Sequence, residues 1–165
     1  MASVLSADDR RSLFALAGLL ALCFAVAALG SAVTLPAIPG WYSALRKPFF
    51  TPPNWMFGPV WTILYLLMAI AAWRIWRCVG DRAARTLALR FFAAQLALNL
   101  AWPFTFFGAR SPALGLIVIV ALEAAIVLTI RAFARLDRPA AWMMAPYAIW
   151  VAYAAAVNLA VVTLN

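Results

Sequence analysis

Residues 41–65 read WYSALRKPFFTPPNWMFGPVWTILY, and the rest of the chain is organised around this stretch. It begins as a polar, aromatic segment and becomes apolar and helical at about Phe57. Four prolines stiffen it, because each proline fixes its own φ angle and removes a backbone donor. Two interpretations are open: residues 41–55 form a lid loop over an apolar pocket, or they form an aromatic belt at a membrane surface.

The composition places the chain in a membrane. It is 68% hydrophobic and 11% charged, against about half and a quarter in soluble domains. Apolar runs of the length that a membrane-crossing helix needs, about 20 residues, occur near 13–35, 57–76, 87–107, 113–133 and 140–164. We therefore predict an all-α membrane protein, a single domain over residues 1–165. Its fold is a five-transmembrane-helix bundle with the long aromatic, proline-rich lid loop between the first two helices.

The basic residues are distributed unevenly between the two ends of such a bundle. Of the 13 lysines and arginines, only Arg46, Lys47 and Arg110 lie on the side of the lid loop. Cytoplasmic loops carry the excess of positive charge, so we expect a cytoplasmic N-terminus and an outside C-terminus. Membrane topology and lipid headgroups explain the net charge of +8, and we expect no nucleic-acid partner. An all-helical protein favours a bacterial inner membrane.

The third apolar run has two different faces at 100° per residue. One face is a ridge of small residues, Ala93, Ala97 and Ala101. The other is polar and aromatic, with Gln95, Asn99 and Trp102. Amides inside a membrane point into protein or a cavity, which leaves the alanine ridge for another helix. That helix belongs either to a second subunit, which makes a homodimer, or to the same bundle in a monomer.

Two other helices carry aromatic faces that point to the same cavity. Trp61 and Tyr65 share one face of the second helix. The last helix bears a narrow strip of aromatic, small and polar residues: Tyr147, Trp150, Ala154 and Asn158. Together with Trp41 and Trp55 of the lid loop and the polar face of the third helix, these residues form the predicted ligand pocket. Aromatic planes with a few amides suit flat apolar ligands.

Glu123 is the one charged residue in the middle of an apolar run. An acid at that depth is expensive and marks a functional site by default. It is a proton carrier, a hydrogen-bonding group for a ligand, or a protonated structural acid; we favour the structural interpretation, because no basic residue lies at the same depth.

The chain contains no histidine, which excludes His-based metal sites, Ser-His-Asp catalysis and His-ligated haem. We expect no metal and no cofactor. No acid/base pair or activated nucleophile supports ordinary catalysis either.

The opening stretch resembles the TspO/MBR family of tryptophan-rich sensory and translocator proteins. That family has the pattern W-Y-x-x-L-x-K-P, then P-P-x-W, then G-P-x-W-x-x-L-Y, which residues 41–65 match. The third and fifth helices continue the resemblance with A-x-x-Q-L-x-x-N-x-x-W-P and P-Y-x-x-W-x-x-x-A-x-x-x-N. In the family the latter residues line the ligand pocket.

The resemblance implies a membrane binding and sensory protein for tetrapyrroles such as protoporphyrin IX. Two alternatives stay open: a transporter of porphyrin or sterol ligands, and an enzyme that degrades porphyrin in light. In the enzyme, Trp150 or Trp55 would be the photo-reactive residue. We expect a binding protein rather than an enzyme.

Overall fold

The computed structural model describes residues 7–165, and long helices make up most of this range. The helices are α1 Ala7–Ala37, α2 Asn54–Arg77, α3 Arg82–Pro103, α4 Pro112–Leu136 and α5 Arg138–Leu164. No strand occurs between residues 7 and 165. Five helical spans are long and apolar enough to cross a membrane. The predicted all-α membrane fold is confirmed.

Two of the helices end in a wider π-helical turn. Segment η1, Ile38–Tyr42, continues α1, and η2, Phe104–Gly108, continues α3. Segment η2 begins immediately after Pro103, the last residue of α3. Such turns are rare and often occur at functional sites. Both lie at the lid end of the bundle, where the candidate site is found.

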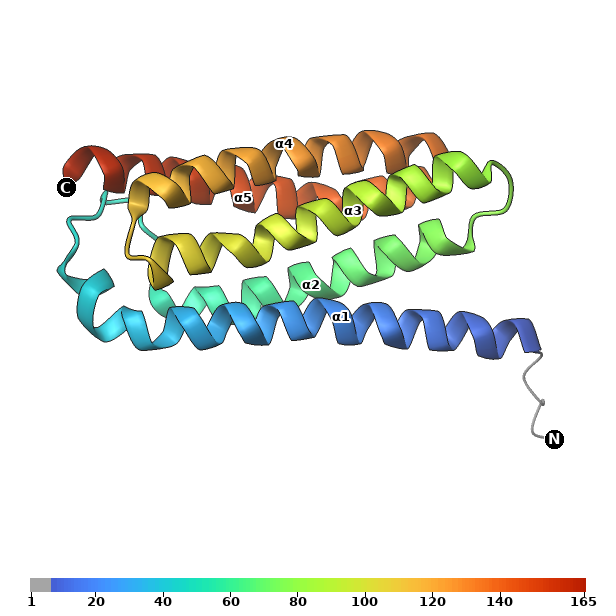
Figure 1. Cartoon of the computed structure of the whole chain (residues 1–165), viewed down its shortest axis with the longest axis horizontal. Coiled ribbons are helices and arrows are strands. Elements are labelled where there is room, and N and C mark those ends of the chain that lie inside the picture. The colour runs from blue at the N-terminus through green and yellow to red at the C-terminus, as the bar shows by residue number, and fades with distance from the viewer. Residues whose placement is uncertain (1–6) are drawn as a thin grey trace.

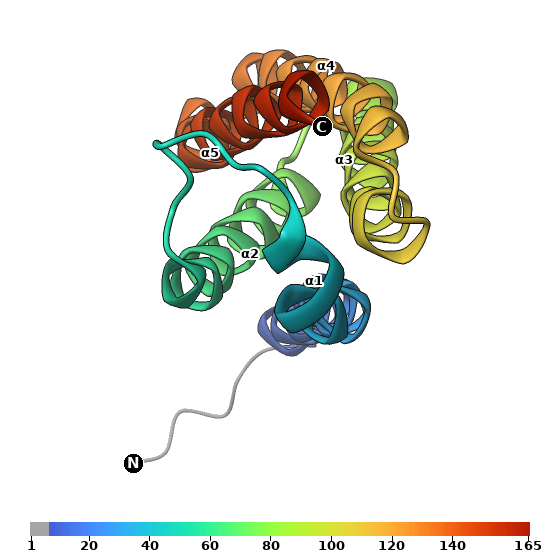
Figure 2. The ribbon, with the colours of Figure 1, turned by 90° about the vertical axis from the view of Figure 1, so that its left-hand side faces the viewer.

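The helices run side by side along the length of the molecule (Figure 1). Helix α4 packs against α3 and α5, while α1 packs against α2 and α3. Seen along the bundle, the lid loop extends from the end of α1 towards α5 and then turns to α2 (Figure 2). The C-terminus lies at this lid end, and the N-terminal part of α1 lies at the opposite end.

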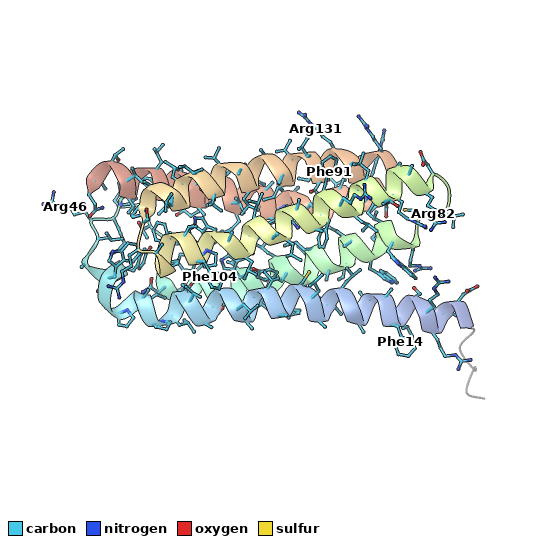
Figure 3. All side chains as sticks on the ribbon, in the orientation of Figure 1. Phe14, Arg46, Arg82, Phe91, Phe104 and Arg131 are labelled. Atoms are coloured by element: carbon cyan, nitrogen blue, oxygen red, sulfur yellow. The ribbon has the colours of Figure 1, made fainter. Side chains whose placement is uncertain are left out.

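Side-chain contacts hold the helices together at the end opposite the lid, here called the arginine end. Arg74 of α2 forms a two-pronged ion pair with Asp137, with N–O distances of 2.7 and 3.2 Å. The indole of Trp73 donates to the backbone oxygen of Ser12 at 3.0 Å. Through these contacts helix α2 is bound to both α1 and the start of α5. Figure 3 shows Arg82 at this end and Arg46 at the lid end.

Small and aromatic residues fill the half of the bundle nearest the arginine end. Ala71 and Ala72 of α2 are fully buried, which lets neighbouring helices approach closely. The rings of Phe92 and Phe133 stack with centroids 6.2 Å apart. This half is closely packed, whereas the lid half contains the cavities described below.

The helices extend beyond most of the predicted boundaries, because hydropathy locates the apolar part of a helix and not its ends. The end is decided by capping: Asp81 accepts hydrogen bonds from Ala83 and Ala84, so α3 starts at Arg82 and not near residue 87. The non-helical part of the lid loop is also shorter than predicted, residues 45–53. Trp41 belongs to η1 and Trp55 to α2.

Candidate functional site

A chain of hydrogen bonds joins three helices in the interior of the bundle. The Tyr65 hydroxyl of α2 donates to Oδ1 of Asn99 on α3 at 2.5 Å. Nδ2 of Asn99 donates in turn to the hydroxyl of Tyr147 on α5 at 2.8 Å. All three side chains are buried. The amide predicted to face a cavity is thus oriented by two tyrosines.

Aromatic rings surround this polar chain. Trp61 lies beside Tyr65, with centroids 5.4 Å apart, and meets Tyr147 edge-on at 6.2 Å. Trp102 stacks on Phe106 of η2 at 5.2 Å. These contacts fix the indole planes, so the walls of the site are rigid and flat.

The larger of two neighbouring cavities, of about 300 Å³, lies between these rings at the lid end of the bundle. Five predicted site residues line it: Trp61, Tyr65, Asn99, Trp102 and Ala154. A cavity mostly walled by apolar and aromatic groups, with a few fixed polar atoms, is typical of a small-molecule site.

A smaller cavity, of about 40 Å³, lies beneath the lid loop. Trp150 and Asn158 line it, and Pro52 of the lid loop closes one side. Trp102 and Ala154 line both cavities, so the two are neighbours. The indole nitrogen of Trp150 is buried without a hydrogen-bond partner among residues 7–165, whereas Trp102 donates to Oδ1 of Asn158 at 3.2 Å.

The other four predicted site residues line neither cavity. Tyr147 accepts a hydrogen bond from Nδ2 of Asn99, which itself lines the larger cavity. Gln95 is buried, and neither its amide oxygen nor its nitrogen has a partner among the described residues. Trp41 packs edge-on against Phe106 at 5.5 Å. Trp55 is 72% exposed. Trp41 and Trp55 thus line neither cavity, and their part in binding a ligand stays a prediction.

Helix α1 supplies cavity wall that we did not predict. Its contribution is a set of small, polar and apolar residues: Phe24, Ala27, Gly30, Ser31, Thr34 and Leu35. The sequence signal for this wall is the spacing of Ala27, Gly30, Ser31 and Thr34 at intervals of one to three residues. This spacing places small side chains along one side of the helix. Gly30 also allows a close approach to α3, since an added Cβ would lie 3.3 Å from Cγ of Pro103.

The lid loop is held closed by contacts with α5 and the C-terminus. The hydroxyl of Tyr153 donates to the backbone oxygen of Phe50. The amide of Asn165 accepts from the backbone N–H of Arg46 and donates to its backbone oxygen, both at 3.0 Å. Phe49 is fully exposed, so the loop covers the small cavity with Pro52 and directs an aromatic ring outwards.

Lys47 is bound within its own loop. Its ammonium group donates to the backbone oxygens of Tyr42, Ser43 and Leu45 at 2.7, 3.3 and 3.0 Å. It also lies over the Tyr42 ring, 4.8 Å from the centroid. These contacts satisfy carbonyl groups at the end of η1, so Lys47 stabilises the start of the loop.

Glu123 lies on α4 and is half buried. Its Oε2 is buried and has no hydrogen-bond partner within residues 7–165. It lines neither cavity, and its function stays an open prediction.

Known proteins resemble this chain over nearly its whole length. The sequence profile of the TspO/MBR family matches residues 19–164. A tryptophan-rich protein TspO of Chlorobaculum tepidum is 39% identical over 155 residues, covering 94% of this chain and 98% of the relative. One from Archaeoglobus fulgidus is 40% identical over 141 residues, with 86% and 90% coverage. The human translocator protein is 35% identical over 122 residues, with 73% and 72% coverage.

Proposed function

The chain belongs to the TspO/MBR family, and on this premise we propose that it binds and senses tetrapyrroles, such as protoporphyrin IX, and similar flat apolar molecules within the membrane. A membrane sensory or binding function fits the family. The ligand class is our proposal, and the observation that carries it is the aromatic cavity of about 300 Å³ around Asn99.

The chemistry of the cavity supports a flat ligand. Trp61 and Trp102 present large apolar planes on which a conjugated ring system stacks. Asn99 has its oxygen and one N–H engaged by Tyr65 and Tyr147. An amide has a second N–H, and this donor is available to orient one polar group of the ligand.

The test is a titration of the purified protein with protoporphyrin IX, followed by tryptophan fluorescence in darkness. We expect saturable quenching that is weakened in Trp61→Phe and Trp150→Phe. The matched control is Trp142→Phe, because Trp142 is on α5 but 76% exposed, away from both cavities. An absence of saturable quenching in the wild type would remove the tetrapyrrole proposal.

Two further measurements, illumination of the same samples and uptake into proteoliposomes, separate the proposed function from its two alternatives. Conversion of the porphyrin that is lost in Trp150→Phe would indicate the enzyme, with Trp150 as the reactive residue. Vectorial uptake into proteoliposomes would indicate the transporter. Stoichiometric binding with neither outcome supports the sensory protein.

We also propose that two copies of the chain associate through the alanine ridge of α3. Ala93 and Ala97 are exposed, and Ala101 is half buried, while Gln95 and Asn99 on the other side of the helix are buried. The ridge therefore has no helix of this chain covering it fully, and a row of small side chains allows the backbones of two helices to approach closely.

A further inference from the structure

The exposed residues that line the larger cavity come from two helices. Of the residues that line it, the exposed ones all belong to α1 or α2: Phe24, Ser31, Leu35, Asn54, Gly58 and Thr62. The lining residues contributed by α3, α4, α5 and the π-helical turns are buried or half buried. The cavity therefore reaches the surface along the seam between α1 and α2, and we call these six residues the α1–α2 window.

The window faces the lipid and not the water beyond the lid. Asn54, Gly58 and Thr62 are spaced by four residues along one line of α2. At 1.5 Å per residue this line is about 12 Å long, and it starts where α2 begins at the lid end. Both helices are membrane-spanning, so the window opens into the half of the bilayer nearest the lid.

Four of the six window residues suit contact with hydrocarbon, and Ser31 and Asn54 are the two polar exceptions. Leu35 is 64% exposed and apolar. The Thr62 hydroxyl donates to the backbone oxygen of Gly58 at 2.9 Å, so it is already satisfied within its helix. Gly58 has no side chain, and a Cβ added there would meet nothing within 4 Å. Gly58 therefore leaves open space in the wall of the window.

The aqueous end of the bundle is closed in contrast. The lid loop is hydrogen-bonded to Tyr153 and to Asn165, and Lys47 stabilises its start. Opening the lid loop would break these contacts, whereas the exposed residues of the α1–α2 window line the cavity while the contacts are intact.

We propose that the apolar ligand enters and leaves the larger cavity sideways from the bilayer, through the α1–α2 window, with the lid loop closed. This inference rests on the proposed function. It restricts the ligands to molecules that dissolve in the membrane and present an edge narrow enough for a seam between two helices.

The test measures the rates of protoporphyrin IX quenching by stopped flow, with the protein in lipid nanodiscs. Gly58→Leu fills the window, and we expect both association and dissociation to slow by about ten-fold, which is a barrier about 1.4 kcal/mol higher. A substitution that only damaged the site would speed dissociation. Gly18→Leu is the matched control, because Gly18 is exposed on α1, lines neither cavity and has nothing within 4 Å of an added Cβ.

Ser31→Leu, on the α1 side of the window, is the second variant and should slow both rates as well. Asn165→Ala loosens the lid loop and should leave both rates unchanged. Faster exchange in Asn165→Ala, or unchanged rates in Gly58→Leu and Ser31→Leu, would overturn lateral entry. Both outcomes can be observed only if the wild type binds the porphyrin saturably. If the proposed function is wrong, the wild type shows no saturable quenching at all, which is a different result.

Discussion

Asn99 and Tyr147 are joined by a buried hydrogen bond of 2.8 Å between α3 and α5, at the edge of the larger cavity. The bond uses the Tyr147 hydroxyl as an acceptor, and it aligns the amide whose other atoms meet Tyr65 and the cavity. The geometry of the polar side of the site thus depends on a residue that does not line the cavity.

Replacing this acceptor should destabilise the bundle. Tyr147→Phe leaves one buried N–H of Asn99 without a partner, which costs about 1–3 kcal/mol. We expect a lower unfolding midpoint in detergent together with weaker porphyrin quenching. Tyr153→Phe serves as the control, because that hydroxyl bonds to an exposed backbone oxygen and its loss should cost less. Equal losses in the two variants would contradict the prediction.

Gly115 should not tolerate a larger side chain. A Cβ at this position would lie 2.8 Å from Cδ2 of Phe106 and 3.1 Å from Oδ1 of Asn158. Because Phe106 stacks on Trp102, Gly115→Ala should displace a wall of both cavities and cost about 1–3 kcal/mol of stability.

Gly18→Ala provides the opposite case for comparison. Its added Cβ meets nothing within 4 Å, and replacing a helical glycine by alanine gains about 0.5–1 kcal/mol. Thermal unfolding of the two variants in the same detergent should therefore move in opposite directions. A stable Gly115→Ala protein would show that Phe106 can shift at no cost.

The alanine ridge predicts a dimer that a single bulky residue disrupts. Ala97→Leu should shift the detergent-solubilised protein towards the monomer, measured by light scattering, because leucine keeps the two α3 backbones apart. Ala152→Leu is the control, since Ala152 is exposed on α5, away from the ridge. An unchanged mass for Ala97→Leu would exclude this interface.

We predict that the arginine end faces the cytoplasm. A membrane-impermeant thiol reagent should therefore label Asn165→Cys in intact cells, in a Cys78→Ser background, and should label wild-type Cys78 only after lysis. Labelling of Cys78 before lysis would show that the arginine end faces outwards and would contradict the predicted orientation.

The labelling of Cys78 should also depend on pH. Burial and the nearby Asp137 raise the pKa of the Cys78 thiol above its ordinary value of 9.0, although Arg74 and Arg85 oppose the shift. The thiol is therefore neutral at pH 7, and its labelling rate should rise as the pH approaches and passes 9.0. A rate independent of pH over this range would contradict the raised pKa.

The amino-acid pattern alone determined the five spans and the two faces of α3. Lipid cannot satisfy an amide, so Gln95 and Asn99 had to face the interior, and their burial beside the exposed Ala97 follows from helical periodicity. Trp61, Tyr65, Trp102 and Ala154 could be assigned to the cavity for the same reason, because each lies on the inner face of its helix.

Only the tertiary structure decided how the lid loop lies and which helices open to the lipid. Two hydrogen-bonded pairs position the loop: Tyr153 with Phe50, which are 103 positions apart in the chain, and Asn165 with Arg46, which are 119 positions apart. Periodicity says nothing of such pairs, so the sequence did not show that Trp55 is largely exposed and lines neither cavity. Nor does it show that Ser31 of α1 and Gly58 of α2 line the same cavity, because the distance between two helices is set by all the side chains that pack between them.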